Sequence, residues 1–481
     1  MGALMARVSG HGPQRDAKET AAAEALSRRS AEVYREILDR APEHDLVPSL
    51  DRIQAVAQLL GDPQRAFEAV HVTGTNGKSS TTRMIERLLR EHNLRTGRFT
   101  SPHLNDVRER ISIDGELIDQ QRFVEVYDEI KPYLDLVDQR NAEAGNPRLT
   151  YFEVLVAMAY AAFADTPVDV AAVEVGLGGS WDATNIVDAR VAVVTPVGVD
   201  HERFLGHDPA TIATEKAGII KPGAVAVLSE QLEEAMEPLL QRAAEVGATV
   251  FREGYEFSVS SREVAVGGQL LTLQGIAAVY PDLFLPLHGA HQAQNAATAL
   301  AAVEAFLLSD GRDWAETDNS REGTGLDIDV VRAAFADASS PGRLEMVRQS
   351  PAVLIDAAHN PSGAQVLADS LEEAFGFSKL VGVVAVLEDK DAEGILGALE
   401  PVLSEVVVTR TSSPRAMDVD ELTEIAEDVF GDDRVASFQR LDDALDYAMG
   451  QAEIGGMIGG GVLATGSVTM AADVRRLFRI R

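Results

Sequence analysis

Residues 70–82 read Val-His-Val-Thr-Gly-Thr-Asn-Gly-Lys-Ser-Ser-Thr-Thr, and they are the most informative part of the chain. An apolar run with β propensity enters a glycine-containing loop that ends on Lys78, and four hydroxyl residues open the helix expected next. Glycines let backbone N–H groups approach phosphate oxygens, the helix N-terminus adds a positive end, and the lysine reaches the outer phosphates. A hydroxyl after the lysine can ligate Mg²⁺. The stretch therefore predicts a triphosphate-binding strand, loop and helix.

This loop is a shortened variant of the usual phosphate-binding pattern. The standard motif has a glycine five residues before Gly77, where this chain has Val72. The remaining motif, G-T-N-G-K-S, leaves a plain glycine-rich turn between a strand and a helix as the alternative. The candidate ATP-binding residues of the loop are Gly74, Thr75, Asn76, Gly77, Lys78, Ser79 and Ser80.

Composition limits the classes of function. A formal net charge of −33 argues against nucleic-acid binding through a basic face and against attachment to anionic membranes. The absence of cysteine excludes disulfides, thiol nucleophiles and cysteine-ligated zinc. No segment supplies about 18 uninterrupted apolar residues, and the N-terminal stretch lacks a signal-like apolar core. We therefore expect a cytoplasmic protein whose anionic substrates bind in a local basic pocket.

The length of 481 residues predicts two domains. We expect a flexible extension over 1–30, an ATP-binding domain over 31–340 and a smaller domain over 341–481. Short apolar runs that alternate with helical stretches are typical of β-α units around a parallel sheet. In the larger domain the runs are 168–175, 191–197 and 224–228, and the helical stretches are 150–164, 229–246 and 291–308.

Two segments depart from this alternation. Residues 255–287 predict a small antiparallel insertion, and the acidic segment 309–325 predicts an exposed loop. After residue 341 the strand pattern restarts, at 352–355, 380–386, 406–409 and 462–464. The predicted fold class is α/β, with a P-loop-type, mostly parallel sheet in the N-terminal domain and a smaller Rossmann-like α/β domain after it.

Polar side chains follow several of the predicted strands. Glu174 ends one apolar run, His201 follows another, and 100–103 reads Thr-Ser-Pro-His after a short extended stretch. Ligands of open parallel sheets bind beyond the carboxyl ends of the strands. A carboxylate, an imidazole and a hydroxyl could hold a divalent metal there, with water completing the shell. A lone glutamate at a strand end is more commonly a cap or an ion-pair partner.

Four further residues are ambiguous or unremarkable from chemistry alone. Lys216 reads as a solvated helix lysine. Arg343 reads as a surface arginine that could also reach a phosphate opposite Lys78. Asp356 and His359 follow a strand, where they could line a site or cap the next helix.

Taken together, the segments resemble the folylpolyglutamate synthase/dihydrofolate synthase family of the Mur-ligase superfamily. The resemblance spans about 45–470, and its segments occur in the family's order. They are Gly74-Thr-Asn-Gly-Lys78, Thr100-Ser-Pro-His-Leu104, Thr150-Tyr-Phe-Glu153, Glu174-Val-Gly-Leu-Gly-Gly179, Trp181-Asp-Ala-Thr-Asn185, Asp200-His201, Glu215-Lys-Ala-Gly-Ile219, Gly289-Ala-His-Gln292 with Asn295, Pro341-Gly-Arg343, Asp356 with His359-Asn-Pro361, and Thr465-Gly-Ser467.

The resemblance implies an ATP-dependent amide ligase with two Mg²⁺ sites. ATP phosphorylates a substrate carboxylate, and the amine of L-glutamate attacks the acyl phosphate. Ser101, Glu174 and His201 match the family's ligands for one Mg²⁺, and Ser79 or Ser80 supplies the hydroxyl after the lysine. Lys216 matches the lysine that the family carries as a carbamate, which can ligate the second Mg²⁺. The residues expected to act in catalysis are Lys78, Lys216 and His201.

The remaining candidate residues are also implied by the resemblance. Asn295, Arg343 and Asp356 match contacts to adenine, phosphate and ribose. His359 and Ser413 match contacts for the incoming glutamate. The family's pterin-binding surface corresponds to Thr150, Tyr151, Phe152, Glu153, Trp181, Asp182 and Ala183. Because both domains contribute, the site is expected in the cleft between them.

The resemblance implies a monomeric, bifunctional enzyme acting on dihydropteroate or tetrahydrofolate. Two departures from the family pattern are Ser79, where glycine is common, and Ser180, where arginine is common. The alternatives are an enzyme that only elongates folates, a peptidoglycan-precursor ligase of the same superfamily, and a switch protein that hydrolyses ATP to change shape.

Overall fold

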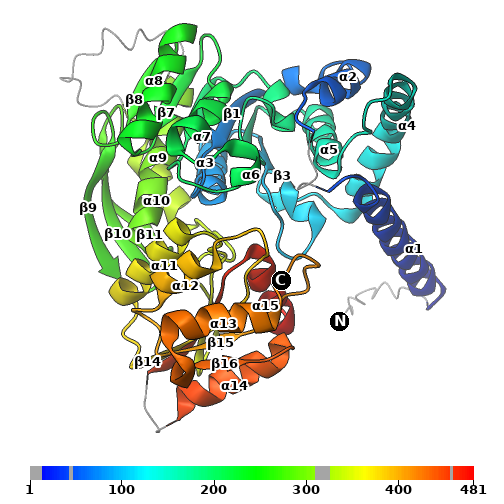
Figure 1. Cartoon of the computed structure of the whole chain (residues 1–481). Helices are drawn as coiled ribbons and strands as arrows, with labels where there is room; N and C mark the ends of the chain where they lie inside the picture. Colours follow the sequence, from blue (N-terminus) through cyan, green and yellow to red (C-terminus); the bar gives the residue numbers. More distant parts are fainter. Residues whose placement is uncertain (1–12, 43–46, 309–324, 455–458, 481) are drawn as a thin grey trace, which may run out of the picture.

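The computed structural model describes residues 13–42, 47–308, 325–454 and 459–480, which form two α/β units (Figure 1). The first unit is built on an eight-stranded sheet and carries a separate three-stranded sheet, and the second is built on a six-stranded sheet. The first twelve residues of the predicted extension, and 309–324 of the predicted acidic loop, lie outside the described residues. The predicted fold class is confirmed.

The eight-stranded sheet places the phosphate loop at its centre. Its strand order is β4-β3-β2-β5-β1-β6-β7-β8, and all neighbours from β2 to β8 are parallel. Val72 of β1 pairs with both Glu174 of β5 and Val193 of β6, so the carboxyl ends of these three strands meet at one edge. The strands are β1 (Glu68–Thr73), β2 (Thr96–Phe99), β3 (Ile111–Ile113), β4 (Glu116–Leu117), β5 (Val170–Glu174), β6 (Val191–Val194), β7 (Val225–Leu228) and β8 (Thr249–Arg252).

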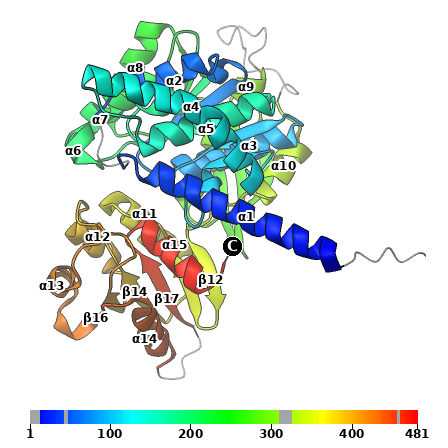
Figure 2. The ribbon, with the colours of Figure 1, turned by 90° about the vertical axis from the view of Figure 1, so that its right-hand side faces the viewer.

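Helices cover both faces of this sheet (Figures 1 and 2). The helix predicted after the phosphate loop is α3 (Lys78–Glu91), and its stripe of Met84, Ile85, Leu88 and Leu89 is buried. One face carries α3, α9 (Ala290–Leu308) and α10 (Ile328–Ala336). The other carries α2 (Asp51–Leu59), α4 (Gln120–Ala144), α5 (Tyr151–Asp165), α7 (Pro209–Lys216) and α8 (Glu233–Val246), and α6 (Glu202–Leu205) precedes α7.

The first helix, α1 (Pro13–Leu38), runs through the predicted boundary between the extension and the ATP-binding domain. Val33 and Ile37 belong to the core formed with α4 and α5, and Arg29 pairs with Asp128 of α4 at 2.5 Å. The C-terminal half of α1 is thus part of the first unit, and the helix lies along its side (Figure 2).

The antiparallel insertion predicted over 255–287 is present. It is a three-stranded sheet of β9 (Ser258–Ala265), β10 (Gly268–Gln274) and β11 (Val279–Leu285). Its inward side chains, such as Leu271 and Leu283, pack against α9 and α10. The insertion therefore extends the core on the α3 face.

The second unit has the strand order β12-β13-β17-β14-β15-β16, with only β12 antiparallel. The four predicted strands correspond to β13 (Ala352–Ile355), β14 (Lys379–Val384), β15 (Glu405–Val408) and β17 (Gly460–Thr465). The edge strands β12 (Glu345–Gln349) and β16 (Val435–Ser437) were not predicted, because their exposed positions leave no apolar run. The helices are α11 (Pro361–Ala374), α12 (Ala392–Leu399), α13 (Val419–Phe430), α14 (Leu441–Glu453) and α15 (Val468–Leu477).

Short 3₁₀ turns connect several of these elements: η1 (Pro63–Arg65), η2 (Val107–Arg110), η3 (Ala183–Ile186), η4 (Ala217–Ile219) and η6 (Asp432–Arg434). Within the part of the chain that the structure describes, no helix has the length and apolarity needed to cross a bilayer.

Candidate active site

The phosphate loop, Gly74–Gly77, needs glycine at both ends. Gly74 has φ +144°, and a Cβ there would lie 1.9 Å from the hydroxyl of Thr195. Gly77 begins α3 with φ +87°, and a Cβ there would lie 2.5 Å from the amide oxygen of Asn295. Asn295 of α9 thus lies directly against the loop, as the resemblance implied for a nucleotide contact.

The loop is held by the segment that follows β6. The N–H of Thr75 donates to the carbonyl of Pro196 at 2.9 Å, and its hydroxyl donates to the carbonyl of Gly198 at 2.9 Å. Gln231, which follows β7, accepts from the N–H of Val197 at 2.8 Å. The loop is thereby fixed from a neighbouring strand, as a preorganised phosphate site requires.

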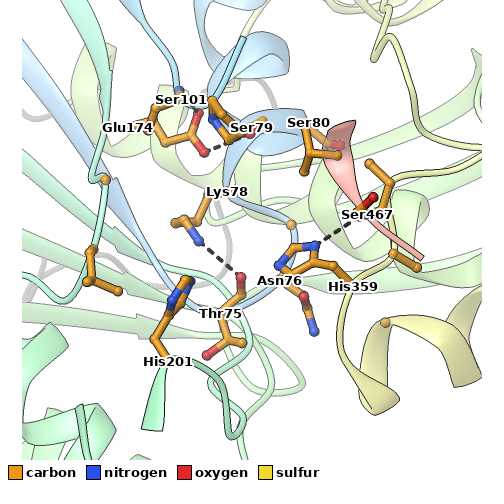
Figure 3. Close-up of a pocket in the computed structure, with 18 of the residues that line it drawn as sticks. Thr75, Asn76, Lys78, Ser79, Ser80, Ser101, Glu174, His201, His359 and Ser467 are labelled. Carbon is orange, nitrogen blue, oxygen red and sulfur yellow. Dashed lines mark hydrogen bonds between the residues drawn. The ribbon is translucent and has the colours of Figure 1, made fainter. Parts of the chain in front are cut away.

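The structure separates the roles of the two serines after the lysine. Ser79 donates to the Glu174 carboxylate at 2.7 Å, and the N–H of Ser101 donates to the other oxygen of Glu174 at 3.1 Å (Figure 3). Ser80 instead pairs with the hydroxyl of Ser340 at 2.8 Å, next to the junction between the units. The predicted metal residues Ser79, Ser101 and Glu174 therefore lie together, and Ser80 lies apart from them.

Two lysines converge on the carbonyl of Gly74. Lys78 donates to it at 3.0 Å and Lys216 at 2.9 Å, although the two lysines are far apart in the sequence. Burial and, to a smaller extent, the charge of Lys78 lower the pKa of Lys216 to about 7. Burial also lowers the pKa of Lys78, which Glu174 and Asp200 counteract. Lys216 therefore has a neutral amine available near pH 7.

The donor set around Glu174 suits Mg²⁺. Among the described residues, no three histidine or acidic side chains form a metal-binding cluster. Magnesium does not need one, because it keeps several waters and binds through one or two carboxylates plus substrate phosphates. Desolvation lowers the pKa of His201 to about 3, although 41% of its side chain is exposed, so its imidazole is neutral near pH 7, the form that can coordinate a metal. In Figure 3, Lys78 lies between Glu174 and His201.

Residues of the second unit complete the site. Arg343 lies at the start of the second unit, and its positive charge lowers the pKa of both Glu174 and Asp356. Asp356 directly follows β13 and accepts from the N–H groups of Leu344 and Ala358, at 2.8 and 2.7 Å. Burial raises the pKa of Asp356, and Arg343 opposes this shift.

One cavity of about 1060 Å³ connects these groups. Gly74, Lys216 and Ser413 do not line it. Lys216 lies behind the loop through Gly74, whereas Ser413 accepts from the N–H of Arg415, which does line the cavity. The predicted site residues that line it are Thr75, Asn76, Gly77, Lys78, Ser79, Ser80, Ser101, Thr150, Tyr151, Phe152, Glu153, Glu174, Trp181, Asp182, Ala183, His201, Asn295, Arg343, Asp356 and His359.

The predicted pterin-binding residues all belong to the first unit and line the cavity. Phe152 packs on Phe99 with ring centroids 5.8 Å apart, and it fills the space above Gly176. Glu153 forms a capping box with Thr150, and both of its oxygens accept from Arg52, at 3.0 and 3.1 Å. The carboxylate of Glu153 is thus largely used in holding α5 and α2 together.

Sequence reasoning missed a polar cluster that crosses the two units. Asp200 accepts from Lys390 and from Asn360, and its carboxylate lies 3.3 Å from Nε2 of His359. Asn76 of the phosphate loop donates to Ser362 at 2.9 Å. Burial would raise the pKa of Asp200, but the hydrogen bond with His359 and the charge of Lys390 hold it below its usual range. The sequence did contain one signal for this cluster: Lys390 is a charged residue that comes after the apolar run of β14.

Comparison with known proteins agrees with this geometry. Residues 72–303 match the Mur ligase middle domain, and 342–468 match the Mur ligase glutamate ligase domain. The chain is 50% identical over 457 residues to the dihydrofolate synthase/folylpolyglutamate synthase of Mycobacterium tuberculosis, covering 91% of this chain and 92% of that protein. The chain belongs to the folylpolyglutamate synthase/dihydrofolate synthase family of Mur ligases.

Other members of this folate–glutamate ligase family show the same relation. The Escherichia coli dihydrofolate synthase/folylpolyglutamate synthase is 33% identical over 84% of this chain and 86% of its own length. The structure of the Mycobacterium tuberculosis folylpolyglutamate synthase with ADP and AMPPCP has a TM-score of 0.87 and 49% identity, over 94% of this chain and 99% of that one. The structure of Escherichia coli FolC with DHPP and ADP has a TM-score of 0.78 and 29% identity, over 94% and 97%. The chain is therefore an ATP-dependent ligase.

Proposed function

We propose that this ligase is bifunctional: it joins L-glutamate to dihydropteroate and then extends tetrahydrofolate at the γ-carboxylate. The observation that carries the proposal is that one cavity contains the phosphate loop, an aromatic wall formed by Phe152 and Trp181, and polar residues of the second unit. Curated relatives that carry both activities in their names support the bifunctional form over the elongation-only alternative.

The first step activates the substrate acid. A carboxylate oxygen attacks the γ-phosphorus of ATP, the bond to the bridging oxygen breaks, and ADP leaves with an acyl phosphate remaining. The N–H groups of the loop and Lys78 hold the phosphates, and Asn295, Arg343 and Asp356 bind the rest of the nucleotide. Glu174, Ser79, Ser101 and His201 would hold one Mg²⁺, which supplies charge neutralisation at the phosphates.

Lys216 is proposed to react as a carbamate. Its amine is buried, its pKa is lowered to about 7, and its Nζ lies 2.9 Å from the carbonyl of Gly74. A neutral amine can add CO₂ and lose a proton, which converts a cation behind the phosphate loop into an anion. That anion would serve the second Mg²⁺ site.

The second step forms the amide. The amine nitrogen of L-glutamate attacks the acyl carbon, the bond to the phosphate oxygen breaks, and the amine proton leaves with phosphate. His359 lies at the cavity next to Asp200 and is placed to contact the incoming glutamate. The role of Ser413 stays a prediction, because its neighbour Arg415 lines the cavity and Ser413 itself does not. We expect the monomer to contain the complete site, because both units of one chain line the cavity.

The proposal is tested by incubating the protein with ATP, Mg²⁺, L-glutamate and either dihydropteroate or tetrahydrofolate, and weighing the products by mass spectrometry. A gain of one glutamate on dihydropteroate and of one or more on tetrahydrofolate is expected. Addition to tetrahydrofolate alone would identify an elongation-only enzyme. Phosphate release without acceptor or glutamate would identify an ATP-driven switch.

A further inference from the structure

Strand β1, which leads into the phosphate loop, also makes hydrogen bonds to the segment that carries several of the predicted pterin contacts. Val70 and Val72 of β1 point into the core beneath α3, so His71 and Thr73 point to the opposite face. Thr73 donates to the carbonyl of Gly178 at 2.7 Å. His71, which is fully buried, lies 2.9 Å from the hydroxyl of Thr184 through Nε2.

The contacts of Thr184 determine the direction of this chain of hydrogen bonds. Its hydroxyl donates to Oδ1 of Asp182 in a short contact, so its oxygen must accept from Nε2–H of His71. Tyr160 donates to the carbonyl of Thr184 at 2.7 Å and keeps the residue in place. The order is therefore His71 to Thr184 to Asp182, with every proton directed toward the carboxylate.

The other ring nitrogen of His71, Nδ1, disfavours hydrogen bonds that run in the opposite direction, from Asp182 to His71. Nδ1 of His71 has no hydrogen-bond partner among the described residues. A reversed chain requires a proton on Nδ1 and a protonated Asp182, which leaves a buried N–H without an acceptor. Such orphaned donors are rarer in proteins than unpaired acceptors. Burial lowers the pKa of His71 to about 3, so a doubly protonated ring is excluded near neutral pH.

Asp182 lines the cavity although only 3% of its surface is exposed. Its oxygens also accept from the N–H groups of Leu177 and Thr184, both at 2.9 Å. The charge of Asp182 acts on two other titratable groups, Lys216 of α7 and Tyr160 of α5, and raises the pKa of each. Burial raises the pKa of Asp182 to about 6, and these hydrogen bonds oppose the rise.

Because Oδ1 of Asp182 already accepts from the N–H and the hydroxyl of Thr184, and Oδ2 from the N–H of Leu177, one lone pair remains on Oδ2. We infer that His71, Thr184 and Asp182 form a one-way relay that keeps Asp182 ionised and orients Oδ2 to accept from one N–H of the bicyclic substrate. His71 and Thr184 are positioning residues that act through Asp182. The inference rests on the proposed function for the identity of the ligand. An ionised carboxylate is a stronger hydrogen-bond acceptor than a neutral acid, so protonation of Asp182 would weaken this contact.

Isosteric pairs of variants test the relay. Thr184→Val keeps the shape but removes the hydroxyl, whereas Thr184→Ser keeps the hydroxyl. Likewise His71→Met removes the donor, whereas His71→Gln keeps an N–H near the position of Nε2. We expect Thr184→Val and His71→Met to raise KM for dihydropteroate roughly tenfold, the loss expected for one hydrogen bond to a charged group. The KM for ATP and kcat should change little, and Thr184→Ser and His71→Gln should resemble the wild type.

A second measurement separates the relay from the identity of the substrate. The pKa of Asp182 is read from ¹³C NMR of protein labelled at the aspartate carboxyl carbon, with Asp182→Asn to assign the signal. A higher pKa in Thr184→Val than in Thr184→Ser supports the relay even if dihydropteroate is not the substrate. Equal pKa values in these two variants would overturn it. A wild-type enzyme that makes no glutamate adduct would instead refute the proposed function.

Discussion

At the scale of single residues, the site depends on which of several similar side chains faces Glu174 and which faces away from it. Ser79 and Ser80 are adjacent, yet one donates to Glu174 and the other pairs with Ser340. Lys78 and Lys216 share one carbonyl acceptor but differ in position, because only Lys78 lines the cavity. Two predictions belong at this scale.

Ser79→Ala and Ser80→Ala should separate the metal role from the packing role. Removing the hydroxyl beside Glu174 is expected to raise the Mg²⁺ concentration for half-maximal activity roughly 10- to 100-fold, as for other groups that orient metal ligands. Ser80→Ala should lower the thermal midpoint and leave the Mg²⁺ dependence in place. Activity titrated with Mg²⁺ checks both variants, and equal Mg²⁺ dependence in the two would contradict the assignment.

Lys216→Ala should reduce turnover more than nucleotide binding. Loss of a charged group next to the reacting phosphates typically costs roughly 100- to 1,000-fold in kcat. ATP affinity, measured by calorimetry, should change by only a few-fold, because the loop keeps its own N–H groups and Lys78. Wild-type activity should fall below pH 7 and recover with added bicarbonate, because carbamate formation needs the neutral amine and the pKa of Lys216 lies at about 7. Full activity of the variant would remove the carbamate role.

At the scale of secondary structure, a loop that follows a strand can be held by hydrogen bonds to a side chain nearby in the sequence. Glu109 of η2 accepts from three consecutive backbone N–H groups, those of Leu104, Asn105 and Asp106. These residues follow Ser101, whose N–H donates to Glu174. Leu104 itself packs into the core of the second unit, so this loop touches both Glu174 and the other unit.

Glu109→Gln should loosen this loop. The amide has one acceptor oxygen where the carboxylate has two, so at least one of the three N–H groups loses its partner. The free energy of unfolding should fall by about 1–2 kcal/mol, and kcat should fall with it because Ser101 is less firmly held. Chemical denaturation and steady-state assays check this. Glu116→Gln, on the exposed strand β4, is the matched control and should change neither.

At the scale of the whole molecule, the junction between the units is polar and passes through the site. Asp200 of the first unit pairs with Lys390 of the second, and both side chains are over nine-tenths buried. Asn76 and Ser362 bring the phosphate loop into the same junction. The contacts that join the units are therefore also contacts that build the cavity.

Asp200→Asn should weaken this junction. It leaves the Lys390 ammonium buried without an ionic partner, and truncating one member of such a pair usually costs more than tenfold in affinity. The KM for glutamate should rise roughly tenfold or more, and the radius of gyration from X-ray scattering should increase. Asp188→Asn, which removes a surface partner of Lys221, is the control. An unchanged KM and an unchanged radius of gyration would show that the pair does not hold the units together.

The phosphate loop, the buried stripe of α3 and the central strands could be predicted from the sequence. They depend on local spacing, on apolar runs and on glycine, which act over a few residues. The antiparallel insertion could be predicted for the same reason. The edge strands β12 and β16 could not, because exposed strands need no apolar pattern.

Tertiary structure alone decided the rest: which serine faces Glu174, which lysine is buried enough to be neutral, and which acid joins the units. The direction of the His71–Thr184–Asp182 relay also appears only in the fold. Each of these depends on contacts between residues more than 90 positions apart, such as Ser79 with Glu174 and Lys216 with Gly74. Desolvation and charge pairing arise from those contacts, so no local pattern in the chain encodes them.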